Sequence, residues 1–415
     1  MILFLKIIKN KVLLMDEENS NDSFVIDPKN PDSKSKDPHR FRKHKAKYIL
    51  VCLTVLILLL IIIILTLVLR SSSDEEKYLE NLLKRELKMA ENGVGIGMYV
   101  IFEDGDTADA SIGFANKETE EVLTGKHRFR SASCSKTFTA VGILQLHENK
   151  KLSLDDTLHS WLPDIYIPNS RIITIRNLLQ HTSGLGDYLH GPLGINRYFM
   201  SDRLHIYTPQ DLLQIGVSQS PISSHSSSFS YSNTNYILLG LIIQKASNLN
   251  LSEYFELNIF EKAKLEGTYL GIADEMEIRE PFCHGYTVYD GEFIDCTRLS
   301  PSVGWAAGAV ITTPRDLASF ASALQKGILI NQNTMQEMMT FQSMMPGYQY
   351  GLGLMRADED NAIGHTGAIA GFMSAFFCKK YYYCFAIYFN YPPITQLYDY
   401  LVVIKKVLTT GHEYY

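Results

Sequence analysis

An unbroken uncharged run from residue 49 to residue 69, made almost entirely of Leu, Ile and Val, constrains this chain more than any other feature. A helix needs about 20 apolar residues to cross a bilayer, and buried core helices rarely contain so long a pure run. The run is too long, and lies too far from the N-terminus, to be a cleaved signal peptide. The sequence therefore predicts a transmembrane signal-anchor helix over 48–70, in contact with a lipid bilayer.

Charged residues on either side of this run set its expected orientation. Arg and Lys gather between positions 40 and 47, whereas Asp74, Glu75 and Glu76 follow the run. Basic residues favour the cytoplasmic side of a membrane. We expect a single-pass type II membrane protein with a cytoplasmic N-terminus and with everything after the run outside the cell or in a lumen.

The rest of the chain divides by composition. Residues 1–47 are predicted to form a disordered cytoplasmic tail, since Asp, Asn, Ser, Pro and Lys dominate 16–47. Translation could start at Met1 or at Met15. Residues 71–91 are interpreted as a stalk, and 92–411 as one folded domain. The net charge of -6, from 39 basic and 45 acidic residues, argues against nucleic acid as a partner.

Strands are predicted at both ends of the folded part. Residues 94–102 and 108–114 flank an Asp104-Gly105-Asp106 turn and predict a hairpin. Strands are also expected at 352–356, 362–365, 372–378 and 383–390, followed by an amphipathic helix at 396–409. Mostly helix and long loop are expected from about residue 152 to about residue 323. We therefore predict an α+β fold, in which N- and C-terminal strands form one antiparallel sheet flanked by helices, beside a mainly helical subdomain.

A buried helix is predicted to start near Ser133, because 138–146 is densely apolar and has no proline. Ser133 and Lys136 are three residues apart and share one helical face. A serine needs a neighbouring base to act as a nucleophile, and a lysine serves as that base when burial lowers its pKa. The same spacing recurs at Ser33 and Lys36 in the tail, so it is not specific alone.

Two further clusters of candidate site residues lie near predicted helices or strands. Tyr231 and Asn233 precede the apolar helix at 236–243, at a loop-to-helix junction. His365, Thr366 and Gly367 lie in a predicted strand, where residues two apart share a face. A glycine in such a strand leaves room for a substrate backbone.

The order Ser133-x-x-Lys136, Tyr231-x-Asn233, His365-Thr366-Gly367 resembles the serine β-lactamase and penicillin-binding-protein superfamily. Within it, the chain is similar to the class C β-lactamase-related group, with D-alanyl-D-alanine carboxypeptidases, esterases and LACTB-like proteins. The stretches 178–185, 313–317 and 350–353 also look familial, and the resemblance spans about 92–390. It implies a β-lactamase/DD-peptidase-like catalytic domain.

The resemblance implies acyl transfer through an acyl-enzyme on Ser133, with Lys136 and Tyr231 sharing the proton transfers. Which of the two is the base stays open. The backbone NH groups of Ser133 and Ala368 would form the oxyanion hole. Asn233 would orient Lys136 and the substrate amide. His365, Thr366 and Gly367 would bind the substrate.

The third motif has histidine where β-lactamases carry lysine. A lysine would bind a substrate carboxylate permanently, whereas a histidine is only partly charged near neutral pH. Physiological β-lactam hydrolysis is therefore not expected. The predicted function is a membrane-anchored serine hydrolase of a small peptide, amide or ester. The alternative is a catalytically weak domain of this fold that acts as a binding, sensor or scaffold protein. No cofactor or metal is expected, because the histidines lack a metal-binding spacing.

The cysteines and one sequon complete the predictions. Cys134 is expected to be a buried structural thiol, and His181 to hold a loop by hydrogen bonding. The four remaining cysteines of the domain allow three pairings, of which we favour Cys283 with Cys296 and Cys378 with Cys384. An oxidising compartment fits the expected topology. Asn250 begins a glycosylation sequon.

Overall fold

The structure is a computed structural model that describes residues 25–26, 34–35, 77, 81, 95–191, 193–197, 200–219, 228–359, 361–380 and 382–391. The chain divides into two units, 1–71 and 72–415. In the first, β1 (Val25–Ile26) and β2 (Lys34–Ser35) pair antiparallel. The predicted transmembrane run, most of the tail and stalk, and the helix at 396–409 lie outside the described residues. Among the helices that are described, none has the length and apolar character needed to span a bilayer.

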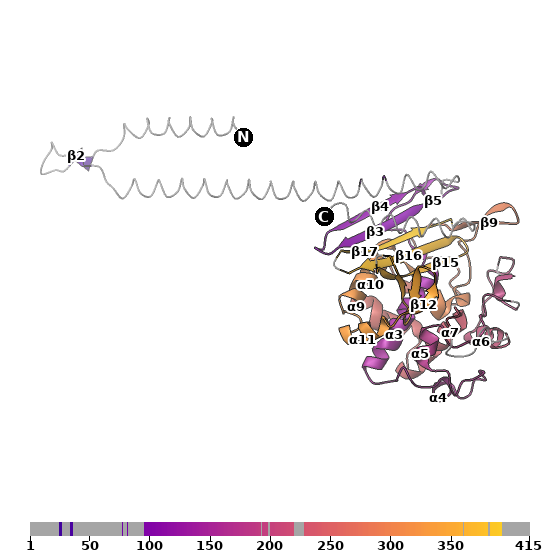
Figure 1. Ribbon diagram of the computed structural model, residues 1–415. Helices are drawn as coiled ribbons and strands as arrows, with labels where there is room; N and C mark the ends of the chain where they lie inside the picture. The colour runs from indigo at the N-terminus through magenta and orange to yellow at the C-terminus, as the bar shows by residue number, and fades with distance from the viewer. Residues whose placement is uncertain are drawn as a thin grey trace. The chain divides into compact units, whose positions relative to one another are not determined.

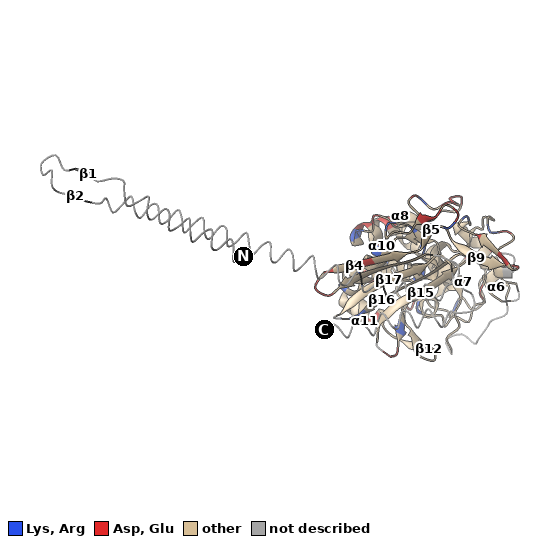
Figure 2. Ribbon diagram, turned by 90° about the horizontal axis from the view of Figure 1, so that it is seen from above, with Lys and Arg blue, Asp and Glu red and all other residues tan. Residues whose placement is uncertain are grey.

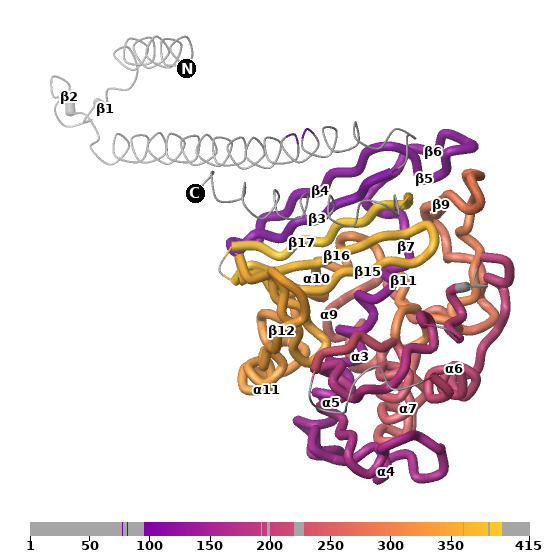
Figure 3. Tube along the Cα trace, turned by 45° about the vertical axis from the view of Figure 1, so that its right-hand side comes forward, coloured from indigo at the N-terminus to yellow at the C-terminus, as the bar shows by residue number. Residues whose placement is uncertain are grey.

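An eight-stranded antiparallel sheet forms one layer of the second unit (Figure 1). Its order is β12 (Gln342–Met345), β13 (Tyr348–Tyr350), β14 (Met355–Ala357), β15 (Ile363–Ile369), β16 (Phe372–Lys379), β17 (Tyr383–Phe389), β3 (Ile96–Phe102), β4 (Thr107–Ile112). β3 pairs with β17 along its whole length, so the indigo N-terminal hairpin lies beside the yellow C-terminal strands in Figure 3. The predicted α+β fold, with one sheet built from both ends of the chain, is confirmed.

Strand alternation gives the sheet two buried faces. Met98 and Val100 belong to one apolar cluster, while Tyr99 packs against another. Phe376 and Phe377, which are adjacent on β16, likewise join opposite clusters. Successive side chains on a strand point to opposite faces, so a central strand covered on both sides is apolar throughout.

Helices pack against one face of the sheet and extend below it (Figures 1 and 3). α10 (Pro314–Gln325) contacts β16, β17 and β3. α3 (Ser135–Glu148) and α7 (Asn233–Ser247) pack against each other. The other helical segments are α4 (Leu158–Trp161), α5 (Ile175–Leu179), η2 (Ile195–Arg197), α6 (Pro209–Val217), α8 (Leu251–Phe255), the π-helix η3 (Glu256–Phe260), α9 (Glu261–Ala263), η4 (Pro301–Val303), η5 (Trp305–Ala307) and α11 (Gln332–Met338). Both basic and acidic residues are scattered over the folded unit in the view of Figure 2.

Several short strands are additional to the predicted ones. β7 (Phe129–Arg130), β11 (Val310–Thr312) and β8 (Tyr269–Leu270) form a three-stranded sheet, β9 (Tyr286–Tyr289) pairs with β10 (Glu292–Asp295), and β5 (Phe114–Asn116) pairs with β6 (Glu121–Val122). Strands of two to four residues are too short to show a period of two, so their sequences gave no signal.

One of the two predicted disulfides is present. Cys378 and Cys384 face each other across β16 and β17 and are bonded, as expected. The Cys283–Cys296 prediction is wrong, because both thiols are free and buried. The β9–β10 register explains this: the Cys296 backbone NH donates to Gly285 O at 2.8 Å, so Cys296 lies opposite Gly285 and not Cys283.

Candidate active site

Ser133 lies on a short 3-10 turn, η1 (Ala132–Cys134), between β7 and α3. From Phe129 to Leu146 every residue is buried except Ser133, which is partly exposed. Ala132 adopts a positive φ of 48°, a left-handed conformation that costs a residue with a side chain about 1–3 kcal/mol. The backbone is therefore strained at the turn that brings the Ser133 hydroxyl to the surface. The helix itself begins at Ser135, two residues after the predicted start.

The edge of β15 lies directly beside this turn. A Cβ atom added to Gly367 would overlap the Ser131 carbonyl oxygen and lie 2.9 Å from the Ser133 backbone nitrogen. Ser374 on β16 also donates to Ser131 O at 2.8 Å. Only a glycine at position 367 allows the two backbones to approach this closely.

Lys136 is completely buried, and its Nζ contacts three oxygen atoms. These are Ser133 Oγ at 3.0 Å, Asn233 Oδ1 at 2.8 Å and Ala307 O at 2.8 Å. Burial lowers the pKa of Lys136 to about 7, against the opposing effect of Asp187. Asn233 Oδ1 and Ala307 O can only accept, so a neutral amine commits both hydrogens to them and directs its lone pair at the Ser133 hydroxyl. This geometry suits a general base.

Tyr231 also lies beside the nucleophile, and its side chain interacts with that of Ser133. Lys136 Nζ lies 5.0 Å from the centroid of the Tyr231 ring. Burial raises the pKa of Tyr231 well above its usual value, and the interaction with Ser133 only partly offsets this. Tyr231 therefore keeps its proton near neutral pH, while Lys136 can lose one.

Asn233 is the first residue of α7 and is buried beside Lys136. Its side-chain nitrogen donates to both carboxylate oxygens of Asp187, each at 3.1 Å. The sequence reasoning missed Asp187, although it lies only two residues past the familial stretch 178–185. A lone carboxylate in a Gly-rich loop carries no motif of its own.

His365 is buried, with both ring nitrogens engaged. Its Nδ1 donates to Thr366 O at 2.6 Å, which leaves Nε2 to accept from the Tyr350 hydroxyl at 3.0 Å. Burial, with Lys136 nearby, lowers the pKa of His365 to about 3. The ring is therefore neutral near pH 7. Its partner Tyr350 comes from a stretch that the sequence reasoning noted without assigning it a role.

The neighbours of His365 are more accessible. Thr366 is partly exposed and Ala368 is exposed. Among the described strands, β14 pairs with β15 only as far as Gly364, so residues 365–369 form an edge beside η1. The predicted roles of Thr366, Gly367 and Ala368 in substrate and oxyanion binding are compatible with this placement and stay predictions.

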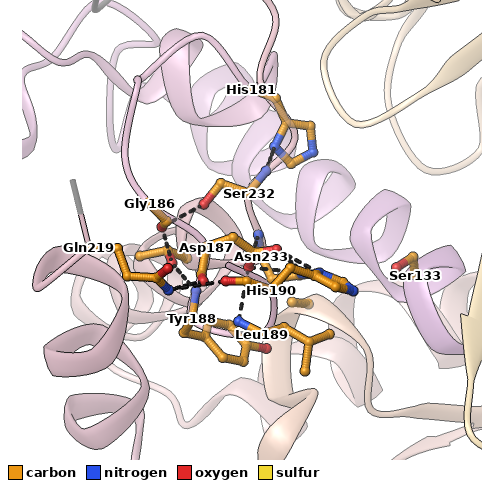
Figure 4. A network of polar contacts seen from close by, with 12 residues as sticks. Ser133, His181, Gly186, Asp187, Tyr188, Leu189, His190, Gln219, Ser232 and Asn233 are labelled. Atoms are coloured by element: carbon orange, nitrogen blue, oxygen red, sulfur yellow. Dashed lines mark hydrogen bonds and ion pairs between the residues drawn. The ribbon is translucent and has the colours of Figure 1, made fainter. Parts of the chain in front are cut away.

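His181 and Cys134 are buried residues that hold the surroundings of the site by hydrogen bonds. His181 Nδ1 accepts from Ser232 N and Asn235 Nδ2, each at 3.2 Å, so it holds the loop before α7 as expected (Figure 4). The Cys134 thiol contacts Ser374 Oγ at 3.3 Å, and burial raises the pKa of Cys134 to about 12. It is the buried structural thiol that the sequence predicted. Within the part of the chain that is described, no three His, Cys, Asp or Glu residues are grouped to hold a metal ion.

Comparison with known proteins agrees with this geometry. The family model for Beta-lactamase matches residues 84–401. The chain belongs to the β-lactamase family. It is 32% identical over 199 residues to Penicillin-binding protein 4* of Bacillus subtilis (strain 168), which covers 47% of this chain and 42% of that protein. It is 27% identical over 280 residues to Putative penicillin-binding protein PbpX of the same strain, which covers 66% and 65%. The chain thus spans less than two thirds of the length of these curated relatives.

Two similar solved structures are hydrolases by name. One is a D-stereospecific amidohydrolase from Streptomyces sp., 28% identical with a TM-score of 0.68, covering 77% of this chain and 94% of that one. The other is a D-amino acid amidase from Ochrobactrum anthropi SV3 complexed with L-phenylalanine amide, 26% identical with a TM-score of 0.67, covering 77% and 91%. The folded part of this β-lactamase family member therefore matches nearly all of each of these structures.

Proposed function

We propose that this protein is a serine hydrolase that cleaves an amide or ester through a covalent acyl-enzyme on Ser133. The observation that carries the proposal is the contact of a buried Lys136 amine with the one partly exposed residue in an otherwise buried segment. Burial supplies a lysine that is partly neutral near pH 7, as a general base requires.

In the proposed reaction Lys136 is the base for acylation. Its lone pair takes the hydroxyl proton as Ser133 Oγ bonds to the substrate carbonyl carbon. The backbone NH groups of Ser133 and Ala368 would hold the resulting oxyanion. Tyr231 would donate its proton to the departing amine or alcohol and regain one from the Lys136 ammonium. Water would then cleave the Ser133 ester by the same proton transfers, releasing the acid and restoring the hydroxyl.

The surroundings of the site favour a substrate without a carboxylate next to the scissile bond. His365 occupies the position where β-lactamases of the Lys-Thr-Gly type carry a cation, but its buried ring is neutral and hydrogen-bonded internally. A neutral imidazole offers no Coulombic attraction to an anion. Together with the amidase neighbours, this supports a small amino acid amide, peptide or ester as the substrate, and not a β-lactam.

We also propose that residues 48–70 anchor the protein in a membrane as a type II protein, on the strength of the sequence. Asn250 is exposed and caps α8, its Oδ1 accepting from Glu253 N at 2.9 Å. Its side-chain nitrogen is accessible for glycosylation if the domain is lumenal. A mass shift on glycosidase treatment that disappears in Asn250→Gln would support this placement. An unmodified Asn250 in protein from a secretory host would count against it.

Covalent labelling tests the hydrolase proposal. The purified domain, from about residue 71 onward, is treated with a fluorescent fluorophosphonate and, separately, with a fluorescent penicillin. We expect labelling that disappears in Ser133→Ala, falls sharply in Lys136→Ala, and persists in Ser160→Ala, a control on the exposed surface of α4. If neither probe labels the folded protein, the hydrolase proposal fails and the binding, sensor or scaffold alternative takes its place.

A further inference from the structure

A buried carboxylate lies behind the proposed active site. Asp187 is almost fully buried, and its oxygens accept from the Asn233 backbone NH at 3.1 Å, from Asn233 Nδ2 at 3.1 Å and from Leu189 N at 3.2 Å. His190 Nδ1, on the exposed side, lies 2.9 Å from Asp187 Oδ2. Figure 4 shows Asp187, Asn233 and His190 gathered together and joined by dashed contacts, with Ser133 on the neighbouring helical segment.

This carboxylate fixes which way the Asn233 amide points. A carboxylate without a proton only accepts hydrogen bonds, so the NH₂ group of Asn233 must face Asp187. The amide oxygen then faces Lys136, at 2.8 Å from Nζ. If the amide turned over, its NH₂ group would oppose the lysine hydrogens and its oxygen would oppose a carboxylate. Asp187 therefore determines whether the Asn233 side chain presents a hydrogen-bond acceptor to Lys136 Nζ.

Asp187 also supplies charge. The titratable groups that act on or contact Lys136 are Asp187, Cys134, Tyr231, Tyr236, His181 and His365. Burial keeps the thiol and both phenols protonated and both imidazoles neutral near pH 7. Among these groups, the carboxylate of Asp187 is the anion that can balance a Lys136 ammonium.

We propose that Asp187 is a positioning residue for the acyl transfer: it holds the Asn233 amide oxygen on Lys136 and balances the ammonium that forms when Lys136 takes the Ser133 proton. The inference rests on the proposed function. It assigns to Asp187 a role in the reaction without contact with the substrate.

Fluorophosphonate labelling rates, followed across the pH range, test this role in three variants. Asp187→Asn removes the charge and leaves an amide that cannot accept from both Asn233 and His190. The exchange variant, Asp187→Asn with Asn233→Asp, keeps one amide facing one carboxylate but moves the charge into contact with Lys136. Asp211→Asn is the matched control, because Asp211, like Asp187, accepts from a backbone NH at a helix N-terminus, but it is exposed on α6.

We expect Asp187→Asn to slow labelling at high pH by up to about 100-fold, the scale of a misplaced catalytic group. Loss of the anion lowers the pKa of Lys136, so the acidic limb of the profile should move to lower pH. In the exchange variant the limb should move to higher pH, and Asp211→Asn should match wild type.

The outcomes separate the two proposals. If the wild type does not label, the proposed function itself fails. If the wild type labels and the acidic limb stays in place in both variants, Asp187 is only structural and the inference is overturned. If Asp187→Asn does not fold, the direction of the shift in the exchange variant decides the question.

Discussion

Replacing Gly367 with alanine tests whether β15 and the Ser133 turn must touch. The new methyl group would overlap the Ser131 carbonyl oxygen and approach the Ser133 backbone nitrogen to 2.9 Å. Both neighbours are backbone atoms, so β15 or η1 must move by roughly 1 Å to restore ordinary contact. A displacement of this size at a reacting group costs about 100-fold in rate, and overpacking costs about 1–3 kcal/mol of stability. We therefore expect Gly367→Ala to fold but to label about 100-fold more slowly.

The assay is the rate of fluorophosphonate labelling, with thermal unfolding measured on the same sample. Gly142→Ala is the control, because its added methyl group also lies in a buried region but meets only side-chain atoms, Ile243 Cδ1 at 3.0 Å and Tyr254 Cε1 at 3.2 Å. Side-chain ends can shift where backbone cannot, so this variant should label at nearly the wild-type rate. Wild-type labelling by folded Gly367→Ala would refute the argument that this contact sets the geometry of Ser133.

Three further predictions follow from the same structure. The pKa of Lys136 is lowered to about 7, so its neutral fraction, and with it the labelling rate, should fall about tenfold for each pH unit below that value. A labelling rate that is flat from about pH 5 to about pH 9 would exclude Lys136 as the base, and so would a rate that falls only below the ordinary pKa of lysine. Tyr231→Phe should lower steady-state hydrolysis of an amide by about 100-fold or more with little change in melting temperature, because a general acid is lost; unchanged turnover would remove Tyr231 from the mechanism. Cys384→Ser should lower the free energy of unfolding in urea by about 2 kcal/mol, as expected for a bridge over a short loop, and reductant should abolish the difference from wild type; equal stability without reductant would contradict the disulfide.

The residues that the sequence singled out by spacing do meet in the structure. Ser133, Lys136 and Asn233 are joined by hydrogen bonds, although Asn233 follows Lys136 by almost a hundred positions. The spacing of Ser133 and Lys136, together with the family resemblance of the motif order, was enough to predict the cluster. The sheet was equally predictable, since β16 and β17 are long and apolar.

Features that depend on register or burial were not predictable. The Cys283–Cys296 pairing failed because the β9–β10 register places Cys296 opposite Gly285, two residues from Cys283, and that register cannot be deduced from the sequence. His365 was expected to be partly charged, but its neutral state follows from complete burial and from Tyr350, fifteen positions earlier in the chain. Asp187 acquires its role only when folding places its carboxylate against Asn233.

The acyl-enzyme itself is the most direct measurement. The purified domain is mixed with an amino acid ester or amide, quenched in acid within the first turnover and measured by intact mass, followed by peptide mapping. We expect a mass increase equal to the acyl group, located on the peptide that carries Ser133 and missing from Ser133→Ala. Substrate turnover without any adduct on Ser133, or an adduct that persists in Ser133→Ala, would contradict the proposed mechanism.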